Sequence, residues 1–220
     1  IVDIGGGTTD IAVFYDSIIY HTAVIPFGGN VITEDIRKGC SIIKKHAEEI
    51  KVKFGSAVAV ENSDDEVVSI PGIRGREAKE ISFKNLASII QARLEEIFDL
   101  VNFEIQKVNS EHKLGAGIVL TGGGAMMKHI CQLAEFKTGM EVRLGTPNGY
   151  LSNETSDDLV TPMFSTGIGL VIEGMAKYEA ERLRGHKNDD MKNEKREEER
   201  IEEKEERLSP LKRIITGFTG

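Results

Sequence analysis

Three consecutive glycines near the start of the chain constrain its fold more than any other feature. Gly5, Gly6 and Gly7 lie between two short apolar segments, 1–4 and 11–15, which are predicted to be strands. Glycines allow a tight turn and let backbone N–H groups approach a ligand closely, and successive N–H groups of such a turn bind anions. Because a strand follows the loop and no Gly-Lys-Ser/Thr sequence is present, the pattern is neither a Walker A loop nor a Rossmann fingerprint.

Polar side chains flank these glycines. Thr8 and Thr9 add hydroxyl donors after the loop, and Asp3 precedes it. An acidic side chain at this point suits a hydrated Mg²⁺, because this ion keeps several of its waters when it binds a protein. We therefore predict a phosphate site with Mg²⁺ held by Asp3 through water. A glycine-rich hairpin without a ligand is the alternative.

A second glycine loop lies in the middle of the chain. Gly122, Gly123 and Gly124, followed by Ala125, come between a predicted strand at 118–120 and a predicted helix. Glycines at a helix N-terminus favour phosphate or other polar groups. Taken alone, the same pattern is also typical of a plain strand-to-helix turn.

A charged pair occupies the helix predicted at 41–54. Glu48 and Lys51 are three residues apart, so both side chains can point the same way. By itself this spacing indicates an ordinary surface ion pair.

The remaining pattern predicts a mixed α/β chain. A third strand at 18–25 completes an antiparallel meander, and Asn30 is a predicted N-cap of the helix that follows. Further strands are predicted at 57–60 and 67–70. Gly55 is the predicted end of the helix at 41–54.

The longest helical pattern covers residues 83–109. Its apolar face consists of Leu86, Ile90, Leu94, Ile97, Val101, Ile105 and Val108. Arg93 falls inside this apolar arc, next to Leu86 and Ile97, where a charge needs a reason. Either the side chain extends past the edge of the core, or it lines a groove for a partner.

The end of the chain changes character. Between Lys192 and Arg207 only Asn193 and Ile201 are uncharged, so this segment cannot bury a face and is a solvated helix or a linker. After it, apolar residues recur at the spacing of an interfacial helix, with two basic residues off that face. These positions are Leu211, Ile214, Ile215 and Phe218, with Lys212 and Arg213.

Composition excludes several classes of protein. The net charge of −8 argues against general nucleic-acid binding, which usually needs a basic face. No apolar run approaches the roughly 20 residues of a membrane-spanning helix. The two cysteines, Cys40 and Cys131, have no metal-ligand spacing and are predicted to be buried thiols.

Together, the motifs resemble the second half of the actin-like ATPase fold in order and separation. The first glycine loop resembles its phosphate-2 loop, the pair Glu48 and Lys51 its ribose and adenine contacts, and the second glycine loop its adenosine motif. Residues 165–169 resemble its connect-2 hinge. The chain is similar to the FtsA family in particular over about residues 1–175, most clearly at 24–36, 115–123 and 142–147.

The resemblance implies an α/β fold class: the C-terminal half of the actin-like (ribonuclease H-like) ATPase fold with an inserted α+β subdomain. Residues 1–52 and 114–180 would form the nucleotide-binding subdomain and 53–113 the inserted one. Residues 181–208 would be a charged linker and 209–220 an amphipathic membrane-targeting segment.

The resemblance also implies a function. It is that of an ATP-binding and Mg²⁺-binding cell-division protein that tethers FtsZ filaments to the cytoplasmic membrane and recruits the divisome. Arg93 and Glu96 would hold the FtsZ C-terminal peptide, and the protein would self-associate into actin-like filaments. It would lie in the cytoplasm, peripheral on the inner membrane face at the division site.

Two other functions on this fold stay open, namely a small-molecule kinase and a PilM-like pilus assembly ATPase. The charged linker and the amphipathic end favour the adaptor. Because Ile1 already lies in a predicted strand, we expect an N-terminal part to be absent. We predict no catalytic residue here, no hydrolysis by this fragment, and at most a weak ATPase in the full-length protein.

Overall fold

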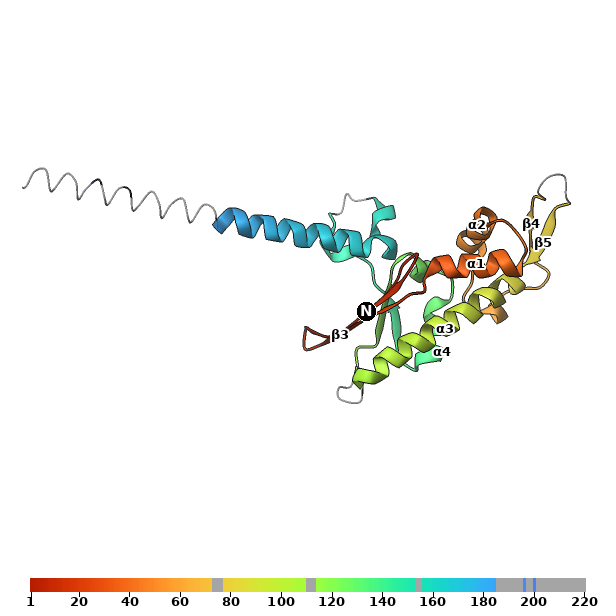
Figure 1. Cartoon of the computed structure of the whole chain (residues 1–220), viewed down its shortest axis with the longest axis horizontal. Helices are drawn as coiled ribbons and strands as arrows, with labels where there is room; N and C mark the ends of the chain where they lie inside the picture. The colour runs from red at the N-terminus through yellow and green to blue at the C-terminus, as the bar shows by residue number, and fades with distance from the viewer. Residues whose placement is uncertain (73–76, 110–113, 153–155, 185–195, 197–199, 201–220) are drawn as a thin grey trace, which may run out of the picture. The chain divides into compact units, whose positions relative to one another are not determined.

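The structure is a computed structural model that describes residues 1–72, 77–109, 114–152, 156–184, 196 and 200 (Figure 1). The chain divides into two compact units, Ile1–Gly169 and Leu170–Gly220. In the second unit, residues 170–184 are helical.

A five-stranded sheet forms the centre of the first unit, in the order β3-β2-β1-β6-β7. The strands are β1 (Val2–Ile4), β2 (Thr9–Tyr15), β3 (Ile18–Ile25), β6 (Ile118–Thr121) and β7 (Val142–Leu144). The first three strands pair antiparallel, as the predicted meander requires, whereas β6 joins β1 and β7 in parallel. The sheet therefore places the ends of β1 and β6, and the glycine loops that follow them, side by side.

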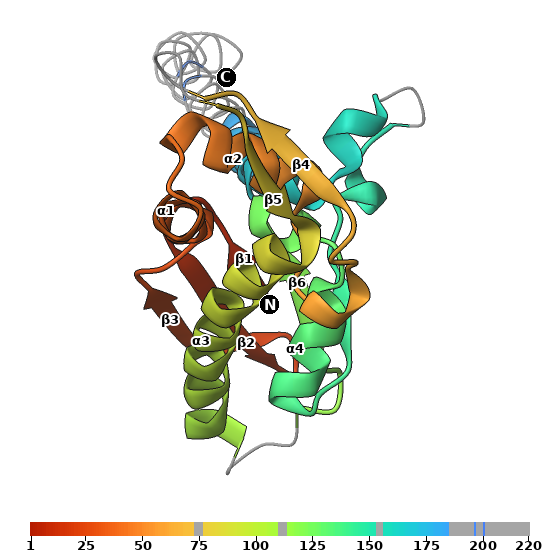
Figure 2. The same cartoon turned by 90° about the vertical axis from the view of Figure 1, so that its right-hand side faces the viewer.

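The described part of this unit also contains four α-helices between residues 29 and 138 and a small hairpin. They are α1 (Gly29–Gly39), α2 (Lys44–Phe54), α3 (Phe83–Asn109) and α4 (Ile130–Thr138), with the hairpin of β4 (Val67–Ile70) and β5 (Lys79–Ser82). Figure 2 shows α1 on one side of α3 and α4 on the other, and both helices contact it. No helix in the described ranges is long and apolar enough to cross a membrane.

Helix α3 confirms the predicted apolar face, because all seven of its predicted apolar positions are buried. Leu86, Ile90, Leu94, Ile97 and Val101 have no accessible surface. The helix packs on β2 and β3 as well as on α1 and α4. It thus links the inserted hairpin to the sheet.

The predicted N-cap at Asn30 is wrong, because α1 begins at Gly29 and its N-cap is Gly28. Gly28 lies against the first glycine loop so closely that a Cβ would come within 2.6 Å of the Gly5 carbonyl oxygen. Tertiary packing of two loops, rather than a capping side chain, therefore sets the start of this helix.

Two other predicted boundaries are also corrected. Residues 57–60 do not form a strand, because Ala59–Glu61 is a 3-10 turn and the Ala59 amide donates to the Gln91 side chain of α3 at 2.8 Å. The second helix begins at Lys44 rather than near residue 41, where Ser41 has a positive φ of 50°. Its predicted end at Gly55 is confirmed. Both cysteines are free thiols, Cys40 buried and Cys131 half-buried.

Candidate functional site

The first glycine loop is fixed on the N-terminus of α1. The Gly5 amide closes the turn by donating to the Thr8 carbonyl at 2.9 Å. The Gly5 and Gly6 carbonyls accept bonds from the first amides of α1, those of Gly29 at 2.9 Å and Asn30 at 2.8 Å. Gly6 and Gly7 at the apex stay exposed. The helix start therefore holds the loop in place while the backbone of its apex faces outward.

The polar side chains around this loop bond mainly to the protein. The Thr9 hydroxyl is buried and donates to the Phe27 carbonyl at 2.8 Å, and Thr8 donates to Asp10 at 2.9 Å. Asp3 accepts a bond from the hydroxyl of Thr166. The Thr9 hydroxyl thus donates to the protein backbone. The sequence pattern could not distinguish this role from contact with a ligand.

The second glycine loop packs directly on the end of β1. Gly122 has a positive φ of 84°, and its amide donates to the Pro162 carbonyl at 3.0 Å. A Cβ on it would lie 2.1 Å from Asp3 Oδ1, and one on Gly124 would lie 2.4 Å from Ile4 Cγ2. Only glycine permits this approach, so the second loop lies against the end of β1 because Gly122 and Gly124 have no side chains.

The helix expected after this loop is present, but it does not start directly at the glycines. A 3-10 turn, η2 (Gly123–Met126), follows the loop, and α4 starts only at Ile130. His129 interrupts the chain with a φ of 60°. Ala125 is buried.

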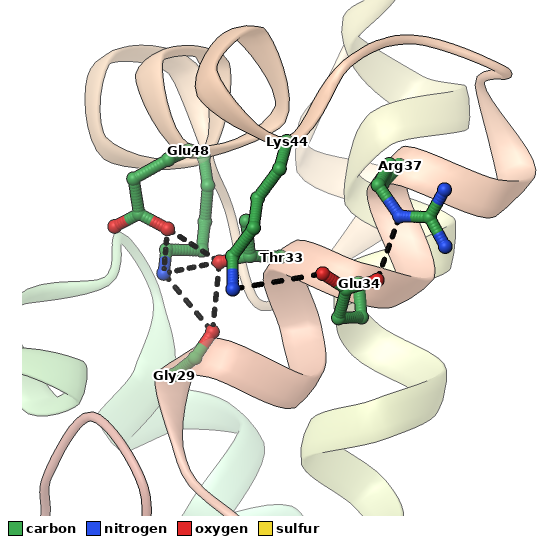
Figure 3. A network of polar contacts seen from close by, with 7 residues as sticks. Gly29, Thr33, Glu34, Arg37, Lys44 and Glu48 are labelled. Atoms are coloured by element: carbon green, nitrogen blue, oxygen red, sulfur yellow. Dashed lines mark hydrogen bonds and ion pairs between the residues drawn. The ribbon is translucent and has the colours of Figure 1, made fainter.

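Glu48 and Lys51 belong to a network that ties α2 to α1 (Figure 3). Lys51 is buried, and its ammonium donates to the Gly29 carbonyl at 3.0 Å and to Thr33 and Glu48 at 2.8 Å each. The single hydroxyl proton of Thr33 is shared between Glu48 and the Gly29 carbonyl. An ammonium has three protons to donate, so the protein satisfies Lys51 completely.

The carboxylate of Glu48 is half-exposed, with 48% of its side chain accessible. Its hydrogen bonds with Thr33 and Lys51 both use Oε2, and Figure 3 shows the other oxygen turned away from the network. Burial alone would raise the pKa of Glu48. The hydrogen bonds from Lys51 and Thr33 outweigh that effect, so the pKa lies below its usual value. Glu48 is therefore an ionised acceptor with one oxygen available.

The two glycine loops and the pair of Glu48 and Lys51 line one cavity of about 320 Å³. The structure brings together six of the predicted site residues there, namely Gly5, Gly6, Glu48, Lys51, Gly123 and Gly124. Asp3, Gly7, Thr8, Thr9, Gly122 and Ala125 are not among the lining residues.

Sequence reasoning missed the apolar wall of this cavity. Met126, Met127 and Met163 line it together with Val52, and Asn30 and Lys128 add polar groups. An apolar wall beside a few polar groups is typical of a ligand pocket. The methionines next to the second glycine loop were the only available signal, and methionine is also common in ordinary cores.

A metal ion would have few protein ligands here. Among the described residues there is no cluster of three or more His, Cys, Asp or Glu side chains. Mg²⁺ bound through one carboxylate, waters and phosphate oxygens needs no such cluster. One carboxylate, that of Asp3, is enough for a site of that kind.

A second cavity, of about 330 Å³, lies where α1 meets α3, and it contains both predicted partner-binding residues. We call it the partner groove, and it is lined by Asp35, Ile89, Ala92, Arg93 and Glu96. Asp35 accepts from Arg93 Nε at 2.6 Å and from Nη2 at 3.2 Å. Glu96 accepts from Nη1, and the Phe27 ring centre lies 5.7 Å from Cζ. The charge in the apolar arc is thus explained by an ion pair with α1, which neither sequence reading included.

The fold places the chain in the class of actin-like proteins. A crystal structure of MreB5 from Spiroplasma citri bound to AMPPNP is 26% identical, with a TM-score of 0.61. The match covers 82% of this chain and 54% of that one.

The family is more specific. The family model described as cell division protein FtsA matches residues 1–169, and the chain belongs to this family. It is 41% identical to the FtsA protein of Pseudomonas aeruginosa and 45% identical to that of Neisseria meningitidis serogroup B, over 80% and 78% of its length. The chain spans only 42% and 41% of these two relatives.

Residues predicted to bind a membrane, Leu211, Lys212, Arg213, Ile214, Ile215 and Phe218, lie outside the described residues.

Proposed function

We propose that this chain supplies one wall of an ATP site in an actin-like cell-division protein. The observation that carries the proposal is the single cavity formed by the two glycine loops and Glu48, three segments far apart in the sequence. The exposed backbone of Gly6 and Gly7 suits phosphate oxygens. The free oxygen of Glu48 suits a ribose hydroxyl, and the apolar methionine wall suits a base.

In this proposal Lys51 does not bind the nucleotide directly. Its three bonds hold Glu48, Thr33 and the first turn of α1 in place. Asp3 holds Mg²⁺ through water, and when bound the ion neutralises charge on the phosphates. The Asp3 side chain, next to Gly122, provides a carboxylate between the two loops.

The test is the affinity of the full-length protein for a fluorescent ATP analogue. Glu48→Gln keeps the shape of the side chain but removes its charge, and charge-assisted hydrogen bonds are worth roughly 1.5–3 kcal/mol. We expect binding to weaken by about tenfold. Glu49→Gln is the matched control, because Glu49 is an exposed neighbour that pairs with His46 instead. Equal affinities for the two variants would contradict the proposal.

We further propose that the partner groove binds the C-terminal peptide of FtsZ through Arg93 and Glu96. A cationic side chain next to the apolar surface of Ile89 and Ala92 suits a peptide with both acidic and apolar groups. The inserted region at 53–113 would be the subdomain that presents this groove.

Arg93→Ala in the full-length protein is expected to weaken binding of that peptide by about tenfold or more, measured by fluorescence anisotropy. Arg37→Ala is the control, since Arg37 also forms an i,i+3 ion pair, with Glu34 of α1. Unchanged binding by the Arg93 variant would exclude this groove as the peptide site.

The remaining parts of the proposal concern the whole protein. ATP binding would organise filaments, residues 181–208 would be a linker, and residues 209–220 would tether the assembly to the inner membrane face at the division site. A peptide of residues 208–220 should bind anionic vesicles better than neutral ones, because Lys212 and Arg213 flank its apolar face. A peptide without that preference would not be the tether.

A further inference from the structure

We propose that Asp35 is a positioning residue of the partner groove, which holds the guanidinium of Arg93 in the orientation that the partner binds. The inference rests on the proposed peptide-binding function of that groove. Asp35 lies on α1, outside the inserted region at 53–113, and has no assigned role in the resemblance or in the proposed function. It is nevertheless part of the groove lining.

The geometry of the ion pair carries the inference. Both oxygens of Asp35 face the same edge of the guanidinium, at 2.6 Å from Nε and 3.2 Å from Nη2. Two parallel bonds to one carboxylate fix the plane of an arginine as well as its position. Phe27 lies over the flat face, with its ring centre 5.7 Å from Cζ. Arg93 is therefore held on one edge and one face.

The opposite edge is the one open to a partner. Nη1 bonds only with Glu96 in this cluster, and the Glu96 side chain is 51% exposed, against 23% for Asp35. An exposed acid three residues along the same helix can leave the contact at little cost, because solvated ion pairs contribute little. A partner can thus exchange with Glu96 at Nη1 while Asp35 keeps its two bonds.

Fixing the arginine before binding has an energetic consequence. A free arginine side chain has many rotamers, and ordering it on association weakens binding. In the structure, Asp35 of α1 already holds the Arg93 side chain in one orientation. Loss of the Asp35 carboxylate should therefore weaken binding of the partner, even if Asp35 itself never contacts the partner.

The experiment is a double-mutant cycle with the FtsZ C-terminal peptide and the full-length protein, read by fluorescence anisotropy. Asp35→Asn, which leaves the shape of the side chain nearly unchanged, is expected to weaken binding of the peptide by about fivefold to tenfold. In an Arg93→Ala background the same change should have no further effect, because Asp35 acts only through Arg93. Asp35→Glu, which restores the carboxylate, should recover part of the affinity.

Asp64→Asn is the matched control. Asp64 forms an ion pair of 2.6 Å with Lys84 of α3, and neither residue lines the groove. This variant should leave the peptide affinity unchanged. Thermal unfolding of each variant separates a loss of folded protein from a loss of affinity.

The outcomes separate this inference from the proposed function. If Arg93→Ala leaves binding unchanged, the groove is not the peptide site and both ideas fail. If Arg93→Ala weakens binding but Asp35→Asn does not, only the positioning role is overturned. It is also overturned if Asp35→Asn weakens binding equally in the Arg93→Ala background, because Asp35 would then act independently.

Discussion

At the scale of single residues, glycines near the candidate nucleotide cavity allow segments of backbone to pack closely. Gly28 has the backbone oxygens of the first glycine loop within 3 Å of where its Cβ would be, whereas Gly7 has nothing within 4 Å. Both look alike in the sequence. Only their surroundings show that packing requires a glycine at position 28 and that packing does not require one at position 7.

Gly28→Ala should therefore destabilise the protein, because a Cβ would lie 2.6 Å from the Gly5 carbonyl oxygen, which is backbone and cannot rotate away. We expect a loss of about 1–3 kcal/mol in the free energy of unfolding, measured with urea. Gly7→Ala should change it by less than about 0.5 kcal/mol. Equal effects of the two variants would show that the loop does not pack on α1 as described.

The ionisation of Glu48 gives a prediction in pH. Its folded-state pKa lies below the ordinary value of 4.5, so its hydrogen bonds stabilise the fold above that pH and are lost as pH falls through the folded-state pKa. Wild-type protein should therefore be more stable than Glu48→Gln near pH 7, and the difference should shrink as the pH falls below 4.5. A difference that stays constant down to pH 3 would contradict the charged network.

At the scale of elements, α3 is the helix on which the inserted hairpin and the sheet both depend. The 3.6-residue spacing of its apolar residues was readable in the sequence over 27 residues. Its partners were not, because spacing identifies the buried face of a helix but not what covers it. Helix α1 covers part of it, and Arg93 joins the two helices.

Leu94→Ala removes a side chain that has no accessible surface in the middle of α3. We expect a loss of about 2–5 kcal/mol, from lost burial and the remaining cavity. Phe103→Ala on the same helix deletes a larger side chain that is 57% exposed, so its cost should be clearly smaller. Denaturant unfolding of both variants measures the difference, and a reversed order would contradict the orientation of α3.

At the scale of the whole molecule, the lining of the candidate cavity comes from segments around the five-stranded sheet. The chain covers 54% of the MreB5 chain whose fold it shares. A nucleotide bound to one wall alone keeps much of its surface in water. Buried contact area, and with it affinity, should therefore be low.

We accordingly predict that this 220-residue chain alone neither hydrolyses ATP nor binds it tightly. Titration calorimetry with ATP and Mg²⁺ should show no binding in the micromolar range, whereas the full-length protein should bind. Micromolar binding by this chain would overturn the prediction and mean that the one wall suffices.

The sequence by itself determined the elements with strong local patterns and the motifs of the family. The strand meander, the long helix and the end of α2 at Gly55 follow from side-chain periodicity and glycine, which act over a few residues. The resemblance to the FtsA family was likewise readable, because it depends on motif order.

Only the tertiary structure decided where α1 starts, that Ala59–Glu61 is a turn, that Thr9 and Lys51 are used internally, and that Asp35 belongs beside Arg93. Each of these depends on contacts between segments distant in the chain. Local propensity differs by less than about 1 kcal/mol per residue for most choices. Packing and buried hydrogen bonds between such segments can outweigh it, and no local pattern records them.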